Sequence, residues 1–60
     1  MNFKSHVSGI PCIIELDGES YEVLDRRGNP APWLTKKVTR QDDIRIYEEI
    51  EDFLYEDARA

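Results

Sequence analysis

Hydrophobic and polar residues alternate over two short stretches in the first half of the chain. The segments I-P-C-I-I-E-L at residues 10–16 and Y-E-V-L-D at residues 21–25 are rich in β-prone residues, and the Gly-containing break D-G-E-S separates them. This pattern predicts an antiparallel β-hairpin. Successive side chains of a strand point to opposite faces, so one face should be apolar. The residues predicted on this core face are Ile10, Cys12, Ile14, Leu16, Tyr21 and Val23.

The opposite face of the hairpin is not wholly polar. Ile13 and Leu24 fall on it, beside Glu15 and Glu22. Apolar side chains in such a position need a cover, which either the loop around Trp33 or another chain could supply. A weak homodimer through Ile13 and Leu24 is therefore one hypothesis.

Apolar positions recur at helical spacing in the last third of the chain. At about 100° per residue they fall within one stripe of about 120°, the width of a core-facing helix surface. Thr39 followed by Asp42 is a variant of the capping box, so a helix should begin there. We expect this helix to pack on the hairpin. Its predicted core residues are Ile46, Tyr47, Ile50, Phe53 and Leu54.

The connection between hairpin and helix reads D-R-R-G-N-P-A-P-W-L-T-K-K-V. Gly28 can adopt a positive φ, and the residues before Pro30 and Pro32 are pushed toward extended conformations. The connection should therefore be stiff and should hold Trp33 in a fixed place. Residues 34–38 could form a short third strand or an irregular connector. Trp33 either closes one end of the core, which we favour in so small a domain, or stays partly exposed.

Together these elements predict the α+β class. We expect a small single domain of ββα type over residues 9–60, in which an antiparallel hairpin, with an optional short third strand, packs against one C-terminal α-helix. Residues 1–8 are polar and show no clear periodicity, so we expect a flexible N-terminal arm there.

Length and charge limit the function classes. Sixty residues make one domain with a small core, which leaves little room for an enzyme cleft. The net charge is −5; residues 1–40 have six basic and five acidic groups, whereas residues 41–60 have two and eight. This balance argues against nucleic-acid binding, which relies on clustered Lys and Arg. No apolar run is long enough to span a bilayer, and a single cysteine suits a reducing cytoplasm.

Candidate catalytic and metal-binding groups are few. Cys12 could be a nucleophile, but its place on the apolar strand face favours a plain buried thiol. His6 has no ligand spacing to Cys12, and two such residues do not make a zinc site. We expect no enzymatic activity, no metal and no cofactor.

A basic and aromatic cluster in the connection is the first candidate binding surface. Arginine and tryptophan are the residue types most enriched at interface hot spots, and the prolines would hold them rigidly. The predicted protein-binding residues are Arg26, Arg27, Trp33 and Lys37, with Lys36 beside them.

The outer side of the predicted helix is the second candidate surface. It is acidic, through Glu48, Glu49, Asp52 and Glu56. Such a face is normally a solvated helix surface, but it could also imitate nucleic-acid phosphates and occupy a basic groove. Ile44 and Tyr55 lie beside it. They either pack against the Trp33 loop, which we favour, or form an exposed anchor.

Two segments of the chain carry a family resemblance: G-I-P-C at residues 9–12 and V-L-D-R-R-G-N-P-A-P-W-L-T-K-K-V-T at residues 23–39. They resemble a group of small proteins encoded by tailed bacteriophages and prophages. The resemblance covers most of residues 9–50. In that group a longer polar insertion separates the two strand-like runs, whereas D-G-E-S joins them directly here. The resemblance implies a phage or prophage product acting in the bacterial host cytoplasm, and it implies no activity.

The leading hypothesis is a non-enzymatic phage accessory protein that binds a host or phage protein, for example a defence factor that it inhibits or redirects. Binding requires only a surface, whereas catalysis requires a preorganised site. An alternative is a structural or assembly protein that self-associates or joins the virion. A second alternative is the acidic nucleic-acid mimic.

Overall fold

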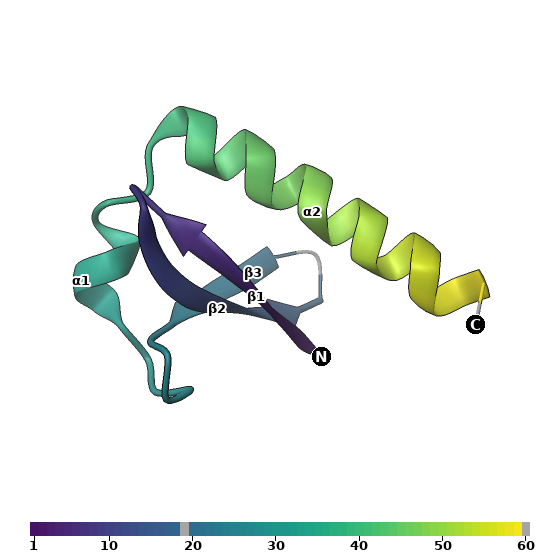
Figure 1. Cartoon of the computed structure of the whole chain (residues 1–60), viewed down its shortest axis with the longest axis horizontal. Coiled ribbons are helices and arrows are strands. Elements are labelled where there is room, and N and C mark those ends of the chain that lie inside the picture. Colours follow the sequence, from purple (N-terminus) through teal and green to yellow (C-terminus); the bar gives the residue numbers. More distant parts are fainter. Residues whose placement is uncertain (19, 60) are drawn as a thin grey trace.

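The computed structural model shows an antiparallel sheet crossed by one long helix (Figure 1). It describes the backbone of residues 1–18 and 20–59, and the side chains of these residues as far as Glu56. The elements are β1 (Asn2–Val7), β2 (Ile10–Asp17), β3 (Ser20–Leu24), α1 (Pro32–Thr35) and α2 (Arg40–Arg59). The predicted α+β class is confirmed, with a C-terminal helix packed on an antiparallel sheet.

The three strands follow one another in space in the order β1-β2-β3, and both pairs are antiparallel. The predicted hairpin is the β2–β3 pair, in which Ile14 lies opposite Val23 and Ile13 opposite Leu24. This register puts Ile14 and Val23 on the core side, as the alternation predicts.

The N-terminal segment is a strand, so the prediction of a flexible arm at residues 1–8 was wrong. Residues Asn2–Val7 pair with β2 along their whole length, with Phe3 opposite Ile14 and Ser5 opposite Cys12. Ser8 and Gly9 both have positive φ (49° and 80°), the conformation of a tight hairpin turn whose twist matches the strands. The domain therefore includes the segment that the prediction left outside it.

The short third strand considered for residues 34–38 is absent from the described backbone, because α1 and a turn occupy this part of the chain. Pro32 stands in the first turn of α1, where a missing N–H costs nothing. The carbonyl oxygen of Ala31 accepts hydrogen bonds from the N–H groups of Leu34 (2.9 Å) and Thr35 (3.1 Å). The third strand of the sheet is instead β1.

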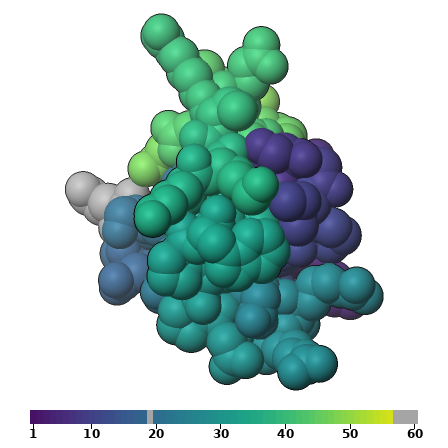
Figure 2. Space-filling model, turned by 90° about the vertical axis from the view of Figure 1, so that its left-hand side faces the viewer, coloured from purple at the N-terminus to yellow at the C-terminus, as the bar shows by residue number. Residues whose placement is uncertain are grey.

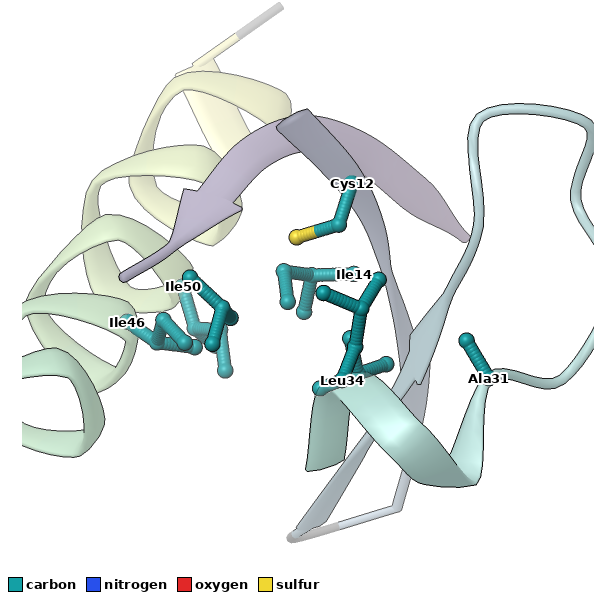
Figure 3. Close-up of a cluster of buried hydrophobic side chains, with 8 residues drawn as sticks. Cys12, Ile14, Ala31, Leu34, Ile46 and Ile50 are labelled. Atoms are coloured by element: carbon teal, nitrogen blue, oxygen red, sulfur yellow. The ribbon is translucent and has the colours of Figure 1, made fainter. Parts of the chain in front are cut away.

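The core lies between one face of the sheet and the two helices (Figure 3). Cys12 and Ile14 point from β2 toward Ile46 and Ile50 of α2, while Leu34 of α1 closes the cluster. The buried core residues are Val7, Cys12, Ile14, Val23, Ala31, Leu34, Ile46 and Ile50. The predicted core residues Ile10, Leu16 and Tyr21 pack against this cluster at its edge.

The predicted capping box at the start of α2 is present. The N–H of Asp42 donates to Thr39 Oγ1 (3.1 Å), and the N–H of Thr39 donates to Asp42 Oδ2 (3.2 Å). Asp42 also accepts a hydrogen bond from the N–H of Ser8 (3.2 Å) and pairs with Arg45 (3.1 Å). The Thr39 backbone hydrogen bond, helped by the other partners, lowers the pKa of Asp42. One side chain thus caps α2 and ties it to the β1–β2 turn.

The predicted core stripe of α2 is only partly buried. Ile46 and Ile50 lie in the core, and Phe53 is half-buried. Tyr47 and Leu54 are 42% and 45% exposed, so their assignment to the core was wrong. They lie at the margin of the helix face that meets the sheet, and the last turns of α2 extend past the sheet (Figure 1).

Candidate functional site

A turn at residues 25–29 presents the two arginines of the first candidate surface. Asp25 Oδ1 accepts hydrogen bonds from the N–H groups of Arg27 (2.8 Å) and Asn29 (3.0 Å). The backbone of Asp25 bonds to Asn29 (2.8 Å) and Gly28 (3.0 Å), and Gly28 has a φ of 86°. Because the turn is closed by its own hydrogen bonds, Arg26 and Arg27 project from a fixed base into solvent.

The chain then returns alongside β3. Leu24 bridges to Pro30, and the N–H of Ala31 donates to the carbonyl oxygen of Val23 (3.2 Å). This short pairing sets the direction in which α1 starts. Within α1, Leu34 is fully buried whereas Trp33 is 53% exposed. The preferred prediction, that Trp33 closes the core, was wrong; Leu34 has this role, since neighbouring helical residues point about 100° apart.

Trp33 and both arginines line one shallow hollow of about 200 Å³. Its lining comes from the start of β2, the 25–29 turn and α1, and consists of Ile10, Pro11, Asp25, Arg26, Arg27, Trp33 and Leu34. Figure 2 shows this end of the molecule, which α1 and the preceding turn form in teal. We call Arg26, Arg27 and Trp33, with the hollow between them, the Trp33 surface.

Two of the predicted basic residues lie outside the Trp33 surface. Lys37 does not line the hollow; it is exposed, and its carbonyl oxygen accepts a hydrogen bond from Ser8 Oγ (2.8 Å). Lys36 lines a separate groove of about 420 Å³ between β3 and α1. The chain direction through α1 and the residues after it therefore separates the two lysines from the two arginines. Sequence reasoning missed Ile10 and Pro11, because strand alternation alone does not show what packs beside a strand's first residues.

The face of the sheet that points away from α2 is less apolar than the sequence suggests. Leu24 is buried and Ile13 is half-buried. A groove of about 390 Å³ on this side is lined by Lys4, Ser5, Pro11, Cys12, Ile13 and Arg26. Lys4 and Arg26 place two positive charges beside Ile13, so two copies meeting here would bring like charges together. Homodimerisation through Ile13 and Leu24 stays a prediction, and these two residues offer little exposed apolar area for it.

The acidic residues of α2 do not form one set. Glu48, Asp52 and Glu56 are exposed. Glu49 is half-buried against the sheet, because its carboxylate accepts a hydrogen bond from Ser5 Oγ (2.6 Å) and lies 3.6 Å from the Arg45 guanidinium. Its assignment to the outer face was wrong, and its role is to join β1 to α2.

Ile44 and Tyr55 lie on the surface of α2, with 51% and 63% of their area exposed. The favoured prediction was that they pack against the Trp33 loop. Their exposure supports the alternative, in which they belong to an exposed surface.

Cys12 is buried, and burial raises the pKa of its thiol, although the nearby Arg45 partly opposes this shift. His6 is exposed on β1, and its backbone carbonyl accepts a hydrogen bond from Arg45. Within residues 1–18 and 20–56, His, Cys, Asp and Glu side chains form no group of three that could hold a metal ion. In the same part of the chain, no helix has the length and apolar character needed to cross a bilayer.

Comparison with protein families places these residues in a known group. The family model described as YuA phage, Gp49 matches residues 17–50, more than half of the chain. The chain belongs to the YuA phage Gp49 family. This agrees with the resemblance to phage proteins carried by the words around Trp33, and it makes the chain a phage protein. Neither the curated proteins nor the solved structures include a match.

The Gp49 match covers the end of β2, β3, the 25–29 turn, α1 and the first half of α2. It therefore includes Arg26, Arg27 and Trp33. It does not reach β1, which pairs with β2 and contacts α2. The matched segment thus holds the three named residues of the Trp33 surface, whereas Ile10 and Pro11, which line its hollow, lie outside the match.

Proposed function

We propose that this phage protein has no enzymatic activity and acts by binding another protein through the Trp33 surface. The observation that supports this is the exposure of a large aromatic side chain beside two arginines that a hydrogen-bonded turn presents. Tryptophan and arginine dominate interface hot spots, and a side chain held in place before binding loses less entropy when the complex forms.

An acidic partner fits this surface best. The structure describes no carboxylate paired in a salt bridge with Arg26 or Arg27. The nearest acidic residue in the chain, Asp25, uses its carboxylate for hydrogen bonds within the turn. A guanidinium matches the two oxygens of a carboxylate and can bind both. The partner should therefore offer Asp or Glu side chains around an apolar spot that contacts the Trp33 ring.

The family membership supports a phage setting for this interaction. We expect it to take place in the cytoplasm of the bacterial host, where the partner is a host or phage protein that is inhibited or redirected. The hollow offers nothing suited to catalysis, since its one carboxylate belongs to Asp25 and is occupied within the turn.

The test is affinity capture from phage-infected cells, followed by quantitative mass spectrometry, with four forms of the protein. Wild type is compared with Trp33→Ala, with the double variant Arg26→Glu and Arg27→Glu, and with Lys36→Glu. Lys36 is the matched control, because it is an exposed cation that lines a different groove.

A partner of the Trp33 surface should be recovered about tenfold less with Trp33→Ala and with the arginine reversal, and within about twofold of wild type with Lys36→Glu. Equal recovery of every captured protein by all four forms would refute the proposal.

A further inference from the structure

α2 has a second apolar stripe, which adjoins the one in the core. Four large apolar side chains on it are 42–63% exposed: Ile44, Tyr47, Leu54 and Tyr55. At about 100° per residue they fall within a sector about 100° wide, which begins at the margin of the core face next to Ile50 and runs away from Ile46. The apolar surface of α2 thus continues from the side that meets the sheet onto the side that meets solvent, which is unusual for the outer helix of so small a domain.

The second stripe has the spacing of a helix-packing seam. Ile44, Tyr47, Glu51 and Leu54 follow one another at intervals of three, four and three residues, the repeat with which two helices pack side by side. The stripe is about 15 Å long, at 1.5 Å per residue. Tyr47 is held at the edge of this face, because its ring packs edge-on against Tyr21 with the ring centroids 5.4 Å apart. This side chain of the stripe is therefore held in place by the sheet.

Glu51 stands in the middle of this seam, between the two apolar pairs. Glu48 and Asp52 are exposed beside it, and the structure describes no salt bridge from any of these three carboxylates. The two described cationic partners of acidic side chains, Arg45 and the N-terminal amine, pair with Asp42, Glu49 and Glu15 instead. The seam is thus apolar with an acidic centre and an acidic border.

We propose that this outer face of α2, formed by Ile44, Tyr47, Glu51, Leu54 and Tyr55, docks one basic amphipathic helix of a partner protein. That helix has an apolar seam with a Lys or Arg opposite Glu51. A carboxylate buried without a cation is strongly unfavourable, so Glu51 selects helices that bring one. A single polar position in a seam also determines register.

A second copy of this chain is a poor occupant of the same face. Two copies would bring Glu51 and Glu48 of one chain against the acidic residues of the other, and like charges across a helix seam repel. The partner differs from that of the Trp33 surface, which needs an acidic protein. The two proposals are therefore independent, and either can fail alone.

The test uses the full chain and a synthetic probe of about 21 residues, which is three heptads. The probe is an amphipathic helix with Leu in the seam, Lys on the flanks and one Lys at the central seam position, and binding is measured by fluorescence anisotropy. Ile44→Ser and Leu54→Ser should each weaken binding about tenfold. Two control variants should change the affinity for the probe less than about twofold. Trp33→Ser removes an equally exposed apolar side chain elsewhere, and Glu22→Gln removes a distant charge.

A charge exchange tests the register. A probe with Glu in place of the central Lys should lose binding to wild type and regain it with Glu51→Lys. The proposal is overturned if a probe of the same composition in scrambled order binds equally well, because attraction would then be purely ionic. It is also overturned if Leu54→Ser binds the probe like wild type, or if the charge exchange fails to restore binding. A dimer in sedimentation that Leu54→Ser dissociates would overturn it too, because the occupant of the face would then be a second copy of the chain.

Discussion

The rings of Phe3 and Phe53 stack with their centroids 5.2 Å apart and their planes 29° from parallel. Phe3 lies near the start of β1 and Phe53 in the second half of α2, so the contact joins the two ends of the chain. The hydrogen bond from Ser5 to Glu49 lies along the same line. Through these contacts β1 and α2 support each other.

Phe3→Ala should lower the free energy of unfolding by about 2 kcal/mol. This is less than the 3–5 kcal/mol typical of a fully buried phenylalanine, because Phe3 is half-buried. Urea denaturation followed by circular dichroism measures it. Lys4→Ala, on the opposite face of the same strand, should change the value by less than about 0.5 kcal/mol. Equal effects of the two variants would mean that β1 does not pack on α2.

Truncation of two adjacent residues of α1 should lower the free energy of unfolding by different amounts. Leu34→Ala removes a fully buried side chain and should cost about 2–4 kcal/mol. Trp33→Ala should cost less, about 1–2 kcal/mol, because half of its surface already contacts solvent. Thermal and urea unfolding of both variants compare them. A large loss of stability with Trp33→Ala would assign this side chain to the core and would remove it from the binding surface.

Acid should destabilise the protein through Asp42. Its pKa is lower in the folded chain than the ordinary value of about 3.9, so its stabilising contribution is complete above that value and is lost as the pH falls through the lowered pKa. Urea midpoints measured between neutral pH and pH 2 should therefore fall at the acid end. Asp42→Asn should flatten this fall, whereas Asp52→Asn, at an exposed position on α2, should leave it close to wild type. A fall of equal size in Asp42→Asn would exclude Asp42 as its source.

The thiol of Cys12 should be unreactive in the folded protein. Burial raises its pKa, so the reactive thiolate is scarce at neutral pH, and the sulfur is also shielded from reagents. A disulfide reagent that releases a coloured thiol on reaction measures this. It should label Cys12 slowly in the folded protein and rapidly in the protein unfolded by urea. Fast labelling of the folded protein at neutral pH would show an accessible thiolate.

The hairpin and the helix were predictable because their signals are local. Alternation over residues 10–16 and 21–25 specifies a strand face wherever the strands lie, and the Thr39–Asp42 capping box sits within one helical turn. β1 was missed because Asn2, Lys4 and His6 on its outer side are polar and Ser5 interrupts its apolar side. The role of Ser5 depends on Glu49, far away in the chain, because the Ser5 hydroxyl donates a hydrogen bond to the Glu49 carboxylate.

The candidate surfaces were partly predictable for the same reason. The word D-R-R-G-N-P-A-P-W-L located Arg26, Arg27 and Trp33, since the turn and α1 are built from neighbouring residues. The separation of Lys37 from them depends on how the chain leaves α1. The exposure of the second stripe on α2 depends on how much of the helix surface the sheet covers. Helical periodicity alone does not predict this area.

By itself the sequence determined the α+β class, the core face of the β2–β3 hairpin, the start of α2 and the choice of Arg26, Arg27 and Trp33 as surface residues. These follow from interactions between residues close in the chain. Only the tertiary structure decided that β1 completes the sheet and that Leu34 rather than Trp33 fills the core. It also decided that Glu49 faces the sheet, while Tyr47 and Leu54 lie at the exposed margin of the helix face that meets it. The small sheet covers only one sector of α2, and burial depends on which surfaces meet in space.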